Sequence, residues 1–205
     1  MASKSRNPRK RPVQARSRIK VDAVLEAAAH ILTRDGPAGL TTNHIAEAAN
    51  ISVGSIYQYF PNKESILVTL MRRQLSRARA MRPAILDRKR SISLTERVQA
   101  AVRWHLDVRR QDPQIHRRLY EVHRDVLTGE ERAEFDRGHA LAVLGGLRHH
   151  RREIAQRNLE TAALVVSQFM LAATQAATAE RPELLTDPDY ERSIVRALLA
   201  YLKGG

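Results

Sequence analysis

The stretch from Val53 to Glu64 concentrates side chains that can recognise a nucleic acid. It reads VGSIYQYFPNKE and holds three aromatic rings, in a chain that has one Trp, five Tyr and three Phe. Gln58 carries an amide that can bond an adenine edge bidentately, and Lys63 carries a compact charge suited to a phosphate. Gly54 has no side chain, so the backbone can approach DNA closely there. The stretch therefore indicates base and phosphate recognition, if helices position it correctly.

Two short helices joined by a tight turn would position this stretch. We expect Thr42 to cap the first helix and Ser52 the second, which ends near Phe60 because Pro61 restricts the residue before it. Asn50 falls between them, where a left-handed turn residue is expected, and Asn tolerates positive φ better than most residues. This spacing is typical of a helix-turn-helix, whose second helix enters the major groove.

Apolar residues at the expected helix crossing support the same arrangement. Ile45, Ile51 and Ile56 fall where the two crossed helices must pack. Ala46 is small, as the close passage of the second helix requires. Phe60 follows Ile56 by four residues and continues the buried stripe. The free backbone N–H groups at the start of the second helix can bind a phosphate.

The rest of the chain predicts helices and no strands. A helical stripe runs over Ile19–Arg34, and Asp35-Gly36-Pro37 would end it with Gly36 in a left-handed conformation. Further helix starts are indicated by Ser93-Leu94-Thr95-Glu96, Asp112-Pro113, Thr128-Gly129-Glu130-Glu131, Asn158 and Asp187-Pro188. The fold class is therefore all-α, with about nine helices.

The composition favours an anionic partner. The 205 residues carry a net charge of +13, which points to nucleic acid first and an acidic membrane surface second. Cysteine is absent, which excludes disulfides and thiolate metal sites. No apolar segment follows the basic start, so we expect no secretion signal. The uncharged run Thr161–Ala179 has too short an apolar part to span a membrane, and we expect a buried helix of a cytoplasmic protein.

These motifs resemble the DNA-binding signature of the TetR family of transcriptional regulators. The resemblance covers roughly residues 17–70, and the rest of the chain is similar only in its helical layout. It rests on Gly39-Leu40-Thr41-Thr42, Ile45-Ala46, Ile51-Ser52, Gly54-Ser55-Ile56-Tyr57-Gln58-Tyr59-Phe60 and Pro61-Asn62-Lys63-Glu64.

The resemblance implies a role for each matching position. Phosphate contacts would come from Thr42, Tyr59 and Lys63. The side-chain chemistry agrees, because Val53 and Tyr57 can pack on a thymine methyl group. The set that faces the groove would be Val53, Gly54, Ser55, Tyr57 and Gln58.

The resemblance also implies a division of the chain. Residues 17–62 would form an N-terminal three-helix helix-turn-helix DNA-binding domain, and residues 63–205 a larger helical domain for effector binding and dimerisation. Residues 1–16 would be a flexible basic arm, either a solvated tail or a supplementary contact to phosphates or the minor groove. The dimer interface would use the apolar helix and the last helix, through Leu159, Ala163, Val166, Met170, Ile194 and Leu198.

Two clusters in the middle of the chain admit more than one interpretation. Trp104 is either a core residue or, with His105 and Tyr120, part of the wall of an effector pocket. His116, Tyr120 and His123 share a helix face, but metal binding would need a third ligand, so we expect no metal there. No pattern typical of catalysis stands out, so we expect neither catalytic residues nor an enzyme.

The resemblance implies a ligand-responsive transcriptional regulator without a cofactor. It would be a repressor that binds a palindromic operator in double-stranded DNA as a homodimer and is released by a small-molecule effector. The alternative is a structural protein that binds DNA without sequence preference, which the net charge also suits.

Overall fold

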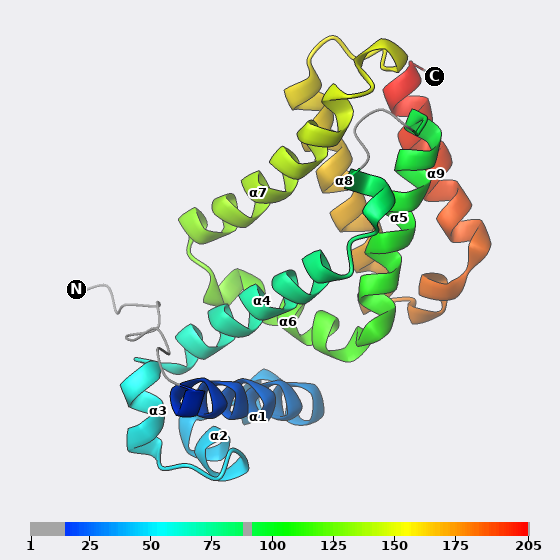
Figure 1. Ribbon diagram of the computed structural model, residues 1–205. Coiled ribbons are helices and arrows are strands. Elements are labelled where there is room, and N and C mark those ends of the chain that lie inside the picture. The colour runs from blue at the N-terminus through cyan, green and yellow to red at the C-terminus, as the bar shows by residue number, and fades with distance from the viewer. Residues whose placement is uncertain (1–14, 88–91, 205) are drawn as a thin grey trace. The chain divides into compact units, whose positions relative to one another are not determined.

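A computed structural model describes residues 15–87 and 92–204, so most of the predicted basic arm lies outside the described residues. Within these ranges the chain forms nine α-helices, three short 3-10 helices and no strand, which confirms the all-α prediction (Figure 1). The α-helices are α1 (Ala15–Gly39), α2 (Thr42–Ala48), α3 (Val53–Tyr59), α4 (Lys63–Ala80), α5 (Leu94–Gln111), α6 (Pro113–Val126), α7 (Gly129–Arg148), α8 (Leu159–Ala179) and α9 (Pro188–Lys203). The 3-10 helices are η1 (Ala84–Asp87), η2 (Arg151–Glu153) and η3 (Pro182–Thr186).

The described residues form two compact units. The first contains α1, α2, α3, the part of α4 up to Arg77, and Gln114–Thr128 with nearly all of α6. The second contains Ala78–Pro113 and the chain from Gly129 onward. The boundary between residues 62 and 63 lies within the first unit, where α4 and α6 also bury apolar residues, and the expected division by function stays a prediction.

The first unit is held together by an apolar core and by ion pairs between α1 and α4. Glu26 of α1 pairs with Arg73 and, at 3.3 Å, with Arg77. The first helix breaks at Gly36, where φ is 72° and ψ is −172°. The positive φ that requires glycine is confirmed, but this ψ lies outside the predicted αL conformation. The fully buried large residues of this unit are Ile31, Leu32, Leu40, Ile45, Ile56, Phe60, Ile66, Leu70 and Ile115.

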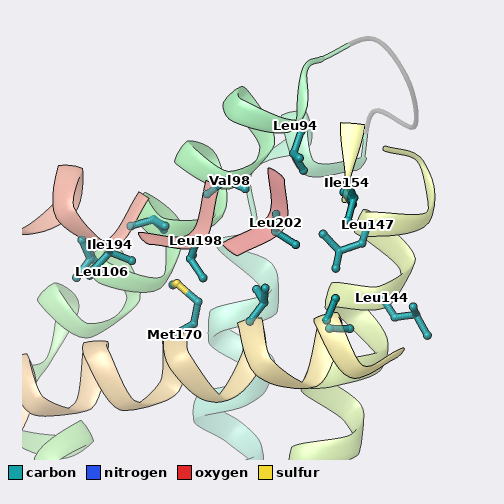
Figure 2. Close-up of a cluster of buried hydrophobic side chains, with 14 of the residues drawn as sticks. Leu94, Val98, Leu106, Leu144, Leu147, Ile154, Met170, Ile194, Leu198 and Leu202 are labelled. Atoms are coloured by element: carbon teal, nitrogen blue, oxygen red, sulfur yellow. The ribbon is translucent and has the colours of Figure 1, made fainter. Parts of the chain in front are cut away.

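The core of the second unit lies between α5, α7, α8 and α9. Figure 2 shows Met170 of α8 below Leu198 of α9, with Leu144 and Leu147 of α7 farther along α8. The predicted capping signals are confirmed at three helix starts in this unit: Ser93 forms a capping box with Glu96, and Asn158 and Asp187 cap α8 and α9.

Candidate nucleic-acid interface

The N-cap of helix α2 lies one residue earlier in the chain than the sequence predicted. Thr41, not Thr42, is the N-cap, and its side-chain oxygen accepts a hydrogen bond from the backbone N–H of His44 at 3.2 Å. Two adjacent threonines are equally suitable as caps, so local sequence alone does not distinguish them. Thr42 is therefore the first residue of the helix and is partly exposed, and its phosphate contact stays a prediction.

The turn between α2 and α3 depends on Asn50. Its φ is 52°, and it is the one residue other than glycine with a positive φ among the described residues, as the sequence predicted. The backbone N–H of Asn50 donates to the carbonyl of Glu47, and that of Ile51 donates to the carbonyl of Ala46, each at 3.0 Å. These bonds satisfy the end of α2 while the chain reverses direction.

The inner face of α3 packs against α2. Ile56 and Phe60 are buried, and so are Ile45 and Ala46 on the facing helix, which confirms the predicted crossing. Ser52 caps α3 as expected, since its side-chain oxygen accepts from the N–H of Ser55 at 3.1 Å. The cap and the buried stripe together fix how α3 is rotated about its own axis.

The outer face of α3 is exposed to solvent. Tyr57 is 44% exposed, and Gln58 beside it is also exposed. The surface around Gly54 is open. Apart from the adjoining residues, the nearest atom to a Cβ placed there would be the hydroxyl oxygen of Ser52, at 4.0 Å. Val53 and Ser55 are partly buried. The structure thus brings the predicted groove-facing set onto a single short helix.

Tyr59 differs from the expectation. It is one of the buried residues of the chain, and its hydroxyl donates to the side-chain oxygen of Ser17 in α1 at 3.3 Å. Tyr59 follows Ile56 by three residues, so the two share a helix face and its ring packs inward. The side chain therefore ties α3 to α1.

The start of α4 positions Lys63. Asn62 caps this helix, because its side-chain oxygen accepts from the N–H of Ser65 at 2.9 Å, and the Ser65 hydroxyl returns a bond to the Asn62 carbonyl at 2.6 Å. Lys63 is exposed in the first helical turn. This cap was not predicted from the sequence, although Asn directly before a helical apolar pattern is a recognised signal. Thus the two ends of the interface, at α2 and α4, are both fixed by side-chain caps.

Two family matches cover most of the chain. Residues 24–70 match the family described as bacterial regulatory proteins, tetR family, and residues 93–202 match the tetracyclin repressor-like C-terminal domain. The second match alone covers more than half of the chain. The chain belongs to the TetR family. This family consists of transcription factors rather than enzymes, and its members recognise DNA through the helix-turn-helix.

Known proteins agree with this membership. Two uncharacterized HTH-type transcriptional regulators, from two strains of Mycobacterium tuberculosis, are each 32% identical over 62 residues, 30% of this chain. The match takes in 31% of each relative, so the chain spans about a third of the length of the curated relatives it matches.

Solved structures of TetR-family proteins share the fold over nearly the whole chain. The fatty acid degradation regulator FadR from Bacillus halodurans has a TM-score of 0.67 at 18% identity, covering 91% of this chain and 95% of its own. A TetR family transcription regulator from Marinobacter aquaeolei has a TM-score of 0.66 at 17% identity, covering 91% and 97%. SmeT, the repressor of the Stenotrophomonas maltophilia multidrug efflux pump SmeDEF, has a TM-score of 0.65 at 19% identity, covering 89% of each chain.

The residues expected in an effector pocket are divided between the two units. Trp104 is partly buried in the second unit, where its indole N–H donates to the carbonyl of Ala78 at 3.0 Å. The His105 ring packs beside Trp104, and its Nε2 lies 3.2 Å from Nε2 of His139 in α7. Tyr120 belongs to the first unit, where its exposed ring stacks on His123 with the ring centres 4.7 Å apart.

The residues expected at a dimer interface lie inside the subunit. Ala163, Val166, Met170, Ile194 and Leu198 are all buried in the core of the second unit, and Leu159 packs against that core. Three other large apolar residues of α8 are exposed instead: Leu164, Val165 and Phe169. By length and composition α8 could cross a membrane, but one of its faces forms the centre of this core.

The His105–His139 pair gives a testable pH dependence of stability. Burial, with smaller effects of His139 and Arg109, lowers the pKa of His105 to about 3, and burial also lowers the pKa of His139. Because an unfolded histidine titrates near pH ~6.5, the unfolded chain binds more protons below that pH. The stability that the neutral pair contributes is therefore complete above pH ~6.5 and is lost as the pH falls toward ~3.

Urea denaturation at pH ~7.5 and ~5 measures this effect. We expect the parent to lose about 1–2 kcal/mol more unfolding free energy between these values than the His105→Gln variant. An equal loss in both proteins would contradict the buried neutral pair.

Proposed function

We propose that this protein is a transcriptional repressor that binds a palindromic operator as a homodimer and leaves it when a small-molecule effector binds. The observation that carries the proposal is the two-sided α3. Its inner residues Ile56 and Phe60 are buried, whereas Tyr57 and Gln58 project from the opposite face. A rigid helix with an open polar and aromatic face suits the major groove.

Each exposed position has a chemical role in this proposal. Gln58 would read an adenine edge, and Val53 and Tyr57 would pack on thymine methyl groups. Gly54 would allow the backbone to approach closely, and Ser55 would bond a base or a phosphate. Thr42 and Lys63, at the starts of α2 and α4, would hold the phosphates on either side. The Tyr59 hydroxyl would add a phosphate contact only by turning its hydrogen away from Ser17.

The exposed face of α8 supports a homodimer. Leu164, Val165 and Phe169 lie along one side of the helix, and contiguous exposed apolar residues mark interaction surfaces. On α9 the exposed positions include the small residues Ala197 and Ala200, which allow close helix approach. We propose these outer faces, rather than the buried stripe of α8, as the dimer interface. A two-fold dimer in turn requires a (pseudo)palindromic operator.

A repressor released by an effector is supported by two considerations. Among the structural neighbours, SmeT is a repressor and FadR is a regulator of fatty acid degradation. In this chain, α5 and α7 hold a partly buried group of aromatic and basic side chains around Trp104 and His105. We propose that an effector binds in the second unit and favours a conformer that fits the operator poorly. The protein would act on DNA in the cytoplasm.

Binding without sequence preference remains the second candidate. It is favoured by the net charge of +13 and by eight Lys or Arg residues among the first 20. Such binding comes from phosphate contacts and shows little discrimination between an operator and random DNA. The two candidates therefore predict different changes in the affinity for operator and for random DNA when a base-facing or a phosphate-facing residue is removed.

Two single variants separate base reading from phosphate contact. We expect Gln58→Ala to weaken binding to an operator, selected from a random DNA pool, by about 1–3 kcal/mol and to relax the preference at one base pair. We expect Lys63→Ala to weaken operator and random DNA alike and to reduce the salt slope by about 1. Gel-shift titrations over a series of salt concentrations measure both.

Lys203→Ala is the matched control, because this exposed lysine lies in α9. It should change neither affinity nor salt slope. The proposal fails if Gln58→Ala discriminates between bases as the parent does, or if the parent binds random DNA as tightly as any selected sequence.

The dimer proposal is tested with Phe169→Glu. A carboxylate without a partner in a buried interface costs at least about 3 kcal/mol, so dimerisation should weaken about 100-fold. Leu141→Glu is the control, since Leu141 is an even more exposed apolar residue, on α7. Sedimentation equilibrium should find a monomer for the first variant and a dimer for the second, and a dimer in both cases would exclude the proposed interface.

A further inference from the structure

Arg109 of α5 is a cation without a partner. Its side chain is partly buried, and within the described ranges it makes no hydrogen bond and no ion pair. Its neighbours on the same helix do have partners: Arg103 bonds Glu191 at 3.1 Å, and Arg110 bonds Asp107 and the carbonyl of Leu185, each at 2.5 Å. The contrast is informative, because buried charges are normally paired.

Two histidines lie beside Arg109. His105 precedes it by one helical turn on the same face of α5, and the His139 ring meets the His105 ring edge-on, with centroids 5.0 Å apart. The two Nε2 atoms are 3.2 Å apart, so one imidazole donates its hydrogen to the other. In a neutral pair this leaves one Nδ1–H donor and one Nδ1 acceptor, and neither has a partner among the described residues.

Burial and positive charge outweigh negative charge around this cluster. Burial lowers the pKa of Arg109 to about 10 and also lowers the pKa of both histidines. Asp136 lies one turn from His139 on α7, and its negative charge slightly raises the pKa of that histidine. It makes no ion pair with Arg109. A cation in such surroundings is destabilised until an anion binds beside it.

The same features argue against a metal ion. The positive charge of Arg109 would repel a cation, and the described part of the chain offers no group of three His, Asp or Glu side chains suited to hold one. Trp104 adds an apolar wall, since its ring centroid lies 4.7 Å from that of His105 and its N–H is already bonded to Ala78.

We propose that Arg109, His105 and His139 bind the oxyanion group, a carboxylate or a phosphate, of an acidic effector whose apolar part lies against Trp104. The guanidinium offers a fork of N–H donors that matches either oxyanion, and the free imidazole N–H adds one more. This inference rests on the proposed ligand response and narrows it to acidic small molecules. Among the described residues Arg109 has no hydrogen bond or ion pair in the absence of ligand, which favours a binding role for the cluster over a structural one.

Matched probes test the charge requirement. The probes are octanoate and 4-phenylbutyrate, the corresponding octyl and 4-phenylbutyl phosphates, and the neutral amides octanamide and 4-phenylbutanamide. The chain has one Trp, so the fluorescence of Trp104 reports binding beside the cluster. We expect at least one anion series to bind about tenfold tighter than its amide, and whichever of carboxylate and phosphate binds tighter identifies the natural group.

Arg109→Gln should abolish that preference and leave the weak amide binding unchanged. Without ligand this variant should be at least as stable to urea as the parent, because the lost charge had no partner. The neighbouring Arg110→Gln is the control: it should lose stability and keep the preference for anions. The inference is overturned if amides bind as well as anions, if neither anion series binds, or if Arg109→Gln retains the preference.

Release of operator DNA by the same probes separates this inference from the proposed function. Anions that bind through Arg109 but leave the DNA complex intact would support the site and contradict the ligand response. Neutral probes that release DNA equally from the parent and from Arg109→Gln would support the ligand response and contradict the site.

Discussion

The left-handed turn at Asn50 determines what α3 can present to DNA. With φ of 52°, the chain leaves α2 and enters α3 within a few residues, and the bond from Ile51 to the carbonyl of Ala46 holds the two helices close. Ile45 of α2 and Ile56 of α3 are then both buried where the two helices cross. Because these inward residues are fixed, the outward direction of Tyr57 and Gln58 follows from the helical period alone.

The division into units suggests how a distant event can reach this helix. The chain passes from one unit to the other at three points, after Arg77, after Pro113 and after Thr128. The helix α6 thus belongs to the unit that carries α3, whereas α5 with Arg109 belongs to the other. The effector that we propose would stabilise one conformation of α5 and α7. It would then act on the DNA-binding unit through these connections, by as much as its affinity differs between the two states.

Local signals in the sequence predicted the DNA-binding unit well. Caps such as Ser52, the turn at Asn50 and the ending at Gly36 each depend on a few neighbouring residues, and the buried Ile56 and Phe60 follow from helical spacing. The phosphate contact predicted for Tyr59 comes from the family resemblance alone. The bond of its hydroxyl to Ser17 joins residues far apart in the chain and has no local signal.

Features that depend on packing between distant helices could not be predicted. The helix α8 is apolar around much of its circumference, so periodicity did not reveal that Ala163 and Met170 face the core while Phe169 faces solvent. The contact of His105 with His139 joins different helices and has no local signal. The same holds for Arg109, because its lack of a partner among the described residues depends on every side chain around it.

The orientation of the recognition helix depends most directly on the Asn50 turn. The affinity of two variants for the selected operator tests this dependence. Asn50→Gly can adopt the same backbone and should bind within about a factor of three of the parent. Asn50→Val places a β-branched residue in a left-handed conformation that costs about 1–2 kcal/mol or more, and it should bind at least about tenfold more weakly while keeping the helical circular dichroism of the parent. Operator binding by Asn50→Val equal to that of Asn50→Gly would contradict the claim that this turn orients the recognition helix.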